Sequence, residues 1–204
     1  MGDTFLDKIY GEATQAETNA VYDAWADTYD TEVGENGYVT PGRLARLLFK
    51  HKPEPQTPVL DYGCGTGLSG QALTKAGFQV IDGTDPNAEM LNGAREKGIY
   101  RRLDLLDLDR DPPIDAGAYD ILTAIGVVGT GAAPPETFDV LMHALSTGGI
   151  LAFSLNDHAL KDARFEGKLC EWLDCGAAHL LAKEYGPHLL GQNLNSNVYI
   201  VEKN

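Results

Sequence analysis

The residues best suited to chemistry follow a short apolar run in the first third of the chain. Residues 59–68 read VLDYGCGTGL, with glycines at alternate positions directly after a strand-like stretch. Because glycine has no Cβ, such a turn lets the backbone bend sharply and approach a bound molecule closely. It also brings the unpaired N–H groups of the next helix to that molecule. Glycine-rich turns occur without ligands too, but at the first crossover of an open α/β sheet this pattern predicts a binding site.

Two features of the turn decide between ligand classes. Residues 65–70 fit the dinucleotide pattern G-x-G-x-x-G. In the dinucleotide fold, however, the first glycine of the pattern follows the strand at once, and here that residue is Gly63. Counted from Gly63, the sixth position of the pattern is Leu68, where the dinucleotide fold needs a glycine or an alanine. Asp61 lies inside the strand, where a carboxylate would repel a pyrophosphate but attract a cationic amine. The turn therefore favours S-adenosylmethionine, which carries an amino-acid head and a sulfonium, over NAD.

The same residues resemble a known family. Residues 59–67 match the first motif of the class I S-adenosylmethionine-dependent methyltransferases, Val-Leu-Asp-x-Gly-x-Gly-Thr-Gly, at every position, and the resemblance spans residues 58–155 in order and spacing. It implies that Asp61, Gly63 and Gly65 bind the cofactor.

Further cofactor contacts follow from the resemblance at the second strand. Asp85 occupies the position of the acid that holds both ribose hydroxyls in the family. Pro86 stands where the family usually places an isoleucine or leucine against the adenine, and it is an acceptable flat, apolar substitute. Met90 belongs to a segment that is similar to the family's next helix opening, and the resemblance implies that it also contacts the cofactor.

A looser part of the resemblance concerns the adenine amino group. Asp107 resembles the acid that accepts this group, and Leu108 would supply a backbone N–H beside it. Asp104 is the alternative acid. The loop also contains Asp109 and Asp111, so a solvated run of charge remains the simpler interpretation that competes with both.

An aromatic segment precedes the core. Residues 21–30, VYDAWADTYD, resemble a segment found ahead of the core in a subset of small methyltransferases. The resemblance implies a helix folded over the cofactor. Tyr22, Trp25 and Tyr29 are three and four positions apart, so we expect one helix face to carry all three as cofactor contacts. Tyr29 is also a candidate catalytic residue beside the methyl group; ordinary core packing is the alternative for this face.

No residue identifies itself as a catalytic base. Methyl transfer depends on holding the acceptor in line with the C–S bond, so positioning alone can supply much of the rate. His158 is the candidate base, with Asn156 and Asp157 beside it, because these residues follow the fifth expected strand at the carboxyl edge of the sheet. A polar loop without catalytic function is the alternative.

The elements that must position these residues alternate regularly along the chain. Strands are expected at 59–62, 78–81, 99–105, 119–124, 150–155, 178–183 and 198–201, and helices at 68–76, 87–97, 135–145 and 165–173. Alternation predicts parallel strands with right-handed crossovers. The last two strands have no helix between them, which suits an antiparallel pair. We therefore expect a single domain over residues 1–204 with a doubly wound, mostly parallel, Rossmann-like α/β sheet of seven strands, the last antiparallel.

The N-terminal part is expected to be a helical lid over residues 1–52, ahead of a core over residues 58–204. Residues 14–17 form the capping-box pattern T-x-x-E at the start of a first helix. Pro41 suits the first turn of a second helix. Three prolines between residues 53 and 58 then form a stiff linker.

Charge and composition limit the partners. The 204 residues carry a net charge of −14, which repels nucleic acids and anionic membranes. A cluster of basic residues at positions 95, 97, 101 and 102 is interpreted as a solvated helix end. The longest apolar run, residues 121–128, is far shorter than the ~20 residues of a membrane span.

The compartment is expected to be the cytoplasm. The first residues contain neither a basic stretch nor an apolar stretch of the secretory type. Cys64, Cys170 and Cys175 make an odd number without metal-ligand spacing, which is typical of free thiols in a reducing compartment. No metal is expected.

Taken together, these features predict transfer of a methyl group from S-adenosylmethionine to an acceptor that the sequence does not identify. The absence of a large insertion after the fourth or fifth expected strand favours a small-molecule acceptor. The main alternative is a binding module that holds S-adenosylmethionine or S-adenosylhomocysteine without turnover. An NAD-dependent oxidoreductase is a distant third.

Overall fold

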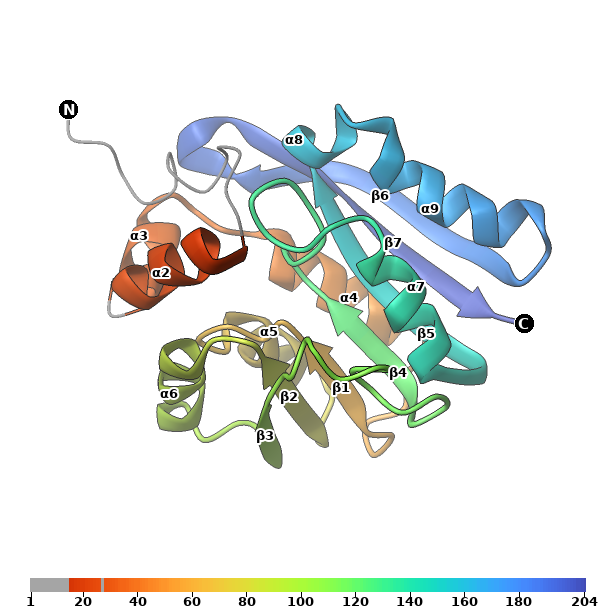
Figure 1. Cartoon of the computed structure of the whole chain (residues 1–204), viewed down its shortest axis with the longest axis horizontal. Coiled ribbons are helices and arrows are strands. Elements are labelled where there is room, and N and C mark those ends of the chain that lie inside the picture. The colour runs from red at the N-terminus through yellow and green to blue at the C-terminus, as the bar shows by residue number, and fades with distance from the viewer. Residues whose placement is uncertain (1–14, 27) are drawn as a thin grey trace.

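A computed structural model of the chain describes residues 15–26 and 28–204 (Figure 1). Within them the strands form one seven-stranded sheet in the order β3-β2-β1-β4-β5-β7-β6. The strands are β1 (Val59–Tyr62), β2 (Ile81–Asp85), β3 (Arg102–Leu105), β4 (Tyr119–Ala124), β5 (Leu145–Asn156), β6 (Ala178–Leu189) and β7 (Leu194–Lys203). The helices are α2 (Gln15–Trp25), α3 (Tyr29–Glu35), α4 (Thr40–His51), α5 (Leu68–Ala76), α6 (Ala88–Glu96), α7 (Thr137–Ala144), α8 (Asp157–Leu160) and α9 (Ala163–Asp174).

The topology confirms the predicted fold class. Strand β1 pairs in parallel with β2 on one side and β4 on the other, and β5 continues the parallel sheet beyond β4. Strand β7 runs antiparallel to both β5 and β6. The chain reverses its direction of winding between β1 and β4, and ligands of open α/β sheets bind in the crevice outside the carboxyl ends of the strands at such a point.

The two faces of the sheet carry separate helical layers because successive strand residues point to opposite sides. Ile121 and Ile150 face one layer, which includes α4 and α5. Leu122 and Leu151 face the other layer, which includes α7, α8 and α9. Each of these buried aliphatic side chains stabilises the fold by about 1.5–3 kcal/mol relative to exposure.

The second strand begins at Ile81, later than the expected residue 78. Phe78 instead belongs to the end of α5, where its N–H bonds to the carbonyl of Leu73. Gly77 takes the positive φ of 127° that this ending requires, and the Phe78 ring packs edge-on against Phe49 at 5.2 Å between centroids. The apolar residue therefore stabilises the end of a helix.

The N-terminal segment differs from the expected lid in two ways. Helix α2 ends at Trp25 and α3 begins at Tyr29, so the prediction that one helix face carries all three aromatic residues is wrong. Helix α4 packs against the sheet through Leu44 and Leu48, which belong to the main core, so only α2 and α3 can act as a lid. Thr14, the expected cap, lies outside the described residues.

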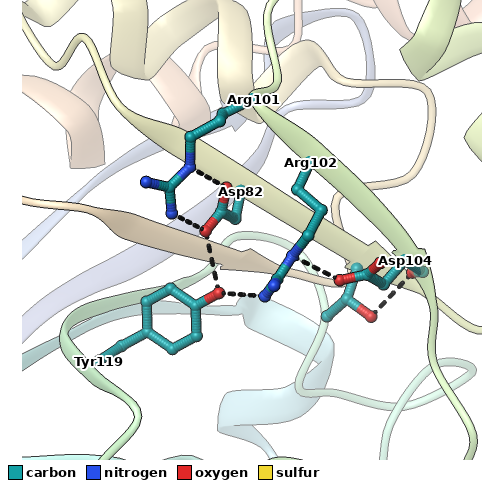
Figure 2. A network of polar contacts seen from close by, with 6 residues as sticks. Asp82, Arg101, Arg102, Asp104 and Tyr119 are labelled. Carbon is teal, nitrogen blue, oxygen red and sulfur yellow. Dashed lines mark hydrogen bonds and ion pairs between the residues drawn. The ribbon is translucent and has the colours of Figure 1, made fainter.

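A polar network at the β3 edge uses the basic residues in which the sequence showed a cluster. Figure 2 shows Arg101 facing the buried Asp82 and Tyr119 donating to the same carboxylate, at 3.0 Å. Arg102 pairs with Asp104 at 2.8 Å and donates to the Tyr119 hydroxyl. Lys97 pairs with Asp30, and Arg95 bonds to Asn92. Lys97, Arg101 and Arg102 therefore join β2, β3, β4 and the lid, which the interpretation as a solvated helix end did not include. Arg95 is exposed and bonds only within α6, as that interpretation expected.

No helix in the described part of the chain is long and apolar enough to cross a bilayer. Cys64 is buried, Cys170 and Cys175 are exposed, and all three are free thiols. The described residues contain no group of three or more histidine, cysteine or acidic side chains that could hold a metal ion.

Candidate functional site

A cavity with about 1000 Å³ of open space lies at the carboxyl ends of β1 and β2, where the winding reverses. The glycine-rich turn after β1 lines one side of the cavity, and the segment after β4 lines another side. Its lining includes Tyr62, Gly63, Cys64, Gly65, Thr66, Leu68, Asp85, Pro86, Met90, Leu106, Leu108, Ile125, Gly126 and Val127. We call it the first cavity.

Two glycines of the turn are required for different reasons. Gly63 has a φ of 66°, and a Cβ there would lie 2.5 Å from Cγ2 of Val127, so the turn and the loop after β4 could not approach each other. Gly65 has a φ of 53°, and a Cβ there would meet no atom of the described residues within 4 Å. Because Gly65 lines the cavity, a side chain at this position would fill space that is open to a ligand.

Asp85 ends β2 and directs its carboxylate to the same turn. Oδ2 accepts the Gly65 N–H and Oδ1 accepts the Asn87 N–H, each at 2.9 Å. A carboxylate has about four acceptor sites, so two remain for a ligand. Burial raises the pKa of Asp85 to about 6, against the opposing effect of these two backbone bonds. The structure therefore offers a buried, bidentate acceptor for a pair of hydroxyl groups.

Apolar side chains surround the space beyond Asp85. Pro86, Met90 and Leu108 line the cavity as the resemblance implied, and Leu106 joins them without having been predicted. Leu106 follows β3 directly, and its N–H bonds to the Asp85 carbonyl, so pairing between β2 and β3 places it there.

The structure does not bring the two candidate adenine acids into this cavity. Oδ1 of Asp107 accepts the N–H of Asp109 within its own exposed loop, at 3.0 Å. Asp104 pairs with Arg102, as described above. Neither acid lines the cavity, and Leu108 is the only one of the three residues considered for this edge that does.

Asp61 also lies outside the cavity lining. Its carboxylate is fully buried and accepts the hydroxyls of Ser69, Tyr100 and Thr123 at 2.6, 2.8 and 2.9 Å. Burial raises the pKa of Asp61, and the three hydroxyl bonds act in the opposite direction. Asp61 thus links β1 to α5, β4 and Tyr100. Its carboxylate bonds to these hydroxyls and does not face the first cavity, where a cationic amine was expected to contact it.

Only two of the three lid aromatics line the first cavity. Tyr22 and Tyr29 line the first cavity, whereas Trp25 does not. Trp25 is 1% exposed and packs with Val33 and Leu189. Its Nε1 donates to Glu32 at 2.9 Å. The Trp25 and Tyr29 rings meet edge to face at 4.5 Å between centroids, so the buried tryptophan orients the tyrosine that faces the cavity.

A second cavity, with about 590 Å³ of open space, adjoins the first. Both are lined by Tyr22, Tyr29, Tyr38, Gly126 and Ala132. The second is also lined by Trp25, Val33, Val128, Gly129, Thr130, Gly131, Ser154, Asn156, His188 and Leu189.

His158, the expected base, lines neither cavity. It lies on α8, where its N–H and that of Ala159 bond to Oδ1 of Asn156. The histidine at the second cavity is instead His188, at the far end of the long strand β6. No local motif marks His188 in the sequence; only the antiparallel return of β6 along β7 brings it to this edge of the sheet.

Tyr38 is a further cavity residue that spacing did not indicate. It bridges to Leu189 of β6 outside the regular strands. A Cβ on Gly126 would lie 2.5 Å from the Tyr38 hydroxyl, so the glycine after β4 makes room for that oxygen. The Tyr38 ring meets the His188 ring edge to face at 5.1 Å.

The lid is attached to the core by polar bonds beside the first cavity. Asn87 donates to Asp23 of α2 at 2.8 Å. Asp30 of α3 pairs with Lys97 and accepts the Thr66 hydroxyl from the glycine-rich turn. In α2, α3 and the glycine-rich turn, residues that line the first cavity therefore lie next to residues that attach the lid to the core.

Comparisons with known proteins give a consistent result. Residues 36–188 match the family model described as a methyltransferase domain. The human methyltransferase-like protein 27 is 32% identical over 136 residues, which cover 65% of this chain and 55% of that protein. The yeast 18S rRNA (guanine(1575)-N(7))-methyltransferase is 35% identical over 75 residues, which cover 37% of this chain and 27% of that protein.

Among solved structures, an S-adenosylmethionine-dependent methyltransferase of Leishmania major superposes with a TM-score of 0.68. Its sequence identity is 14%, and the match covers 99% of this chain and 87% of that one. This likeness supports the fold. The chain spans about half the length of the human relative.

Proposed function

This chain belongs to the family of methyltransferase domains, and from that premise we propose that it transfers the methyl group of S-adenosylmethionine to a small molecule. The first cavity would hold the cofactor and the adjoining second cavity the acceptor. One observation carries the proposal: Asp85 and Gly65 together present a bidentate buried acceptor next to a space that no Cβ fills.

The residues present fit the cofactor part by part. Asp85 retains acceptor sites for two ribose hydroxyls. Pro86, Met90, Leu106 and Leu108 supply apolar walls for a flat base. The open space at Gly65 suits the amino-acid end, whose carboxylate would lie beside the first N–H groups of α5, at Leu68 and Ser69. When bound, S-adenosylmethionine supplies an electrophilic methyl group on a sulfonium sulfur.

Catalysis would rest on placement of the acceptor. The two cavities share Tyr22, Tyr29 and Tyr38, so these rings border the path between them. An aromatic face favours a neighbouring cation by up to about 2 kcal/mol when water is excluded. We propose that Tyr29 contributes in this way or through its hydroxyl, and that the aromatic rings exclude water from the reacting groups when the ligands are bound.

A small acceptor suits the surface as well as the cavities. The yeast relative is named for action on 18S rRNA, but this chain carries a net charge of −14, which opposes approach to a phosphate backbone. The cations at positions 97, 101 and 102 are already paired with acids. These features favour a metabolite over a nucleic acid.

Turnover of methyl-labelled S-adenosylmethionine against a panel of small metabolites, with peptides and RNA assayed beside it, tests the proposal. We expect at least one panel member to take up label, and Asp85→Ala to reduce the rate at limiting cofactor. Tight binding of S-adenosylhomocysteine with no labelled product from metabolites, peptides or RNA would support a non-catalytic binding module instead. Label found in RNA alone would contradict the small-molecule acceptor.

A further inference from the structure

A buried histidine lines one side of the second cavity. His188 is 5% exposed, and its Nδ1 lies 2.9 Å from the Thr40 hydroxyl. Among the described residues no group bonds Nε2, and every fully buried polar side-chain atom there has a partner. Nε2 must therefore reach open space, and the open space that His188 borders is the second cavity.

A chain of hydrogen bonds fixes which nitrogen of His188 carries the proton. The Arg43 guanidinium, which can only donate, bonds to Ser196 Oγ at 3.1 Å. Ser196 Oγ lies 2.8 Å from the Thr40 hydroxyl, the one acceptor within reach of the serine proton among the described side chains. Thr40 then accepts from Ser196 and donates to Nδ1. His188 consequently keeps its proton on Nε2 and presents an N–H to the cavity.

The remaining polar groups on this side of the second cavity are suited to donate as well. Ser154 Oγ accepts the Gly126 N–H at 2.9 Å, which leaves its own proton to donate. Oδ1 of Asn156 is taken by two backbone N–H groups, so its amide NH₂ is what it can offer a ligand. No described residue that lines this cavity is acidic or basic apart from His188. Burial lowers the pKa of His188 to about 4, so the ring is neutral at physiological pH.

Resting on the methyl transfer proposed above, we propose that the second cavity binds a small planar carboxylic acid, held through its carboxylate by the Nε2–H of His188 with Ser154 and Asn156. Aromatic walls of Tyr22, Trp25 and Tyr38 suit a flat body. A cluster of donors favours an oxygen anion and disfavours an ammonium group, which would need acceptors.

The carboxylate also removes the need for a base. His188 cannot take a proton on Nε2, because that nitrogen already carries one. A carboxylate arrives deprotonated: one electron pair of its oxygen forms the new O–C bond to the methyl carbon, the C–S bond breaks with its pair passing to sulfur, and no proton moves. The products are a neutral methyl ester and a neutral thioether, so charge and atoms balance.

Imidazole ¹⁵N NMR of the full chain saturated with S-adenosylhomocysteine tests the relay. We expect the His188 signals, assigned with His188→Gln, to show the Nε2–H form. Thr40→Val removes the hydroxyl and should let both tautomers appear, whereas Thr40→Ser should keep the wild-type spectrum. A proton found on Nδ1 in the wild type would overturn the proposal.

Binding of benzoate to the same complex tests the ligand class, with benzylamine as the cationic probe of matched size. We expect benzoate to bind and benzylamine not to. His188→Leu should weaken benzoate binding by about tenfold or more, since it deletes a donor to a charged group. His188→Gln retains a donor and should recover most of the affinity, and His179→Gln on the exposed part of β6 should change nothing.

The outcomes separate this inference from the proposed function. If S-adenosylhomocysteine binds but benzoate does not, or if benzylamine binds equally well, the acceptor class is wrong while the cofactor assignment stands. If S-adenosylhomocysteine itself fails to bind, the proposed function fails. Retention of S-adenosylhomocysteine binding shows that each variant is folded, and should His188→Leu lose it, Ser154→Ala replaces that variant with the same expected direction.

Discussion

Two buried aspartates on neighbouring strands show how environment assigns a carboxylate its task. The oxygens of Asp61 on β1 accept three side-chain hydroxyls, and Asp61 lines neither of the two cavities. Asp85 on β2 accepts only two backbone N–H groups and keeps acceptor capacity toward the first cavity. The sequence predicts that both aspartates lie near a cofactor. The structural acid differs from the binding acid in the hydroxyls that surround it, which come from three separate segments of the chain.

Replacing Asp85 by alanine should weaken the binding of S-adenosylhomocysteine by about 2–3 kcal/mol, because a charged bidentate acceptor for the ribose is lost. Calorimetric titration measures the change, and circular dichroism confirms the fold. Asp107→Ala is the matched control, since the exposed Asp107 does not line the cavity. Equal affinity in a folded Asp85→Ala protein would remove Asp85 from the site.

The raised pKa of Asp85, about 6 against the ordinary 3.8, predicts opposite pH trends for stability and binding. Because the folded protein favours the protonated form, the stability contributed by this group is fully present below pH 3.8 and is lost as pH rises through 6. Ribose hydroxyls favour the ionised form, so affinity for S-adenosylhomocysteine should rise over the same interval and level off above about pH 7.

Titrations across this interval check the trend, with Asp85→Asn as the control that cannot ionise. The variant should bind more weakly and show a flat profile near pH 6. A wild-type affinity that stays constant through pH 6 would show that Asp85 does not contact the ligand in its ionised form.

Tyr29 allows the contributions of ring and hydroxyl to be separated. If the ring stabilises the sulfonium, Tyr29→Phe should bind S-adenosylmethionine normally, and Tyr29→Ala should lose up to about 2 kcal/mol of affinity. If the hydroxyl orients a ligand, Tyr29→Phe should already be impaired. S-adenosylhomocysteine, which has no positive sulfur, is the control ligand. Wild-type binding of both ligands by both variants would exclude Tyr29 from the site.

Among the helices, α3 and α4 follow each other closely but have different tasks. Helix α4 buries Leu44 and Leu48 in the main core, against the sheet and α5. Helices α2 and α3, side by side at one end of the molecule in Figure 1, bury a small separate cluster around Trp25. They reach the core through polar bonds such as Asp23 to Asn87. Few buried apolar contacts between these helices and the rest of the described chain predict low local stability, which suits an element that opens for a ligand.

Hydrogen exchange should therefore distinguish the lid from α4. We expect protection across Tyr22–Trp25 and α3 to increase when S-adenosylhomocysteine binds, because Tyr22 and Tyr29 gain a surface to cover. Exchange in α4 should stay the same, which serves as the internal control. Equal protection of the lid with and without ligand would make α2 and α3 ordinary packing elements.

For the molecule as a whole, the sequence was informative where a pattern is local. Strand–helix alternation predicted the seven-stranded sheet, and the turn at residues 59–68 predicted the first cavity, because both depend on neighbouring residues. The sequence pattern wrongly places Phe78 in a strand, because apolar character alone does not distinguish a helix end from a strand. It also wrongly places Tyr29 on the helix of Trp25, because spacing alone does not distinguish one helix from two. His188 and Tyr38 could not be found at all, because β6 and the segment before α4 meet only through tertiary pairing.

The nucleotide-like molecule that the first cavity accepts decides whether S-adenosylmethionine is the cofactor. Calorimetric titration of the wild-type chain with S-adenosylmethionine, S-adenosylhomocysteine, NAD and NADP measures this in one experiment. We expect the two sulfur compounds to bind with dissociation constants near 1 μM, which corresponds to about 8 kcal/mol of binding free energy. We expect the dinucleotides to give no heat of binding. Binding of NAD or NADP with no response to S-adenosylhomocysteine would contradict the account.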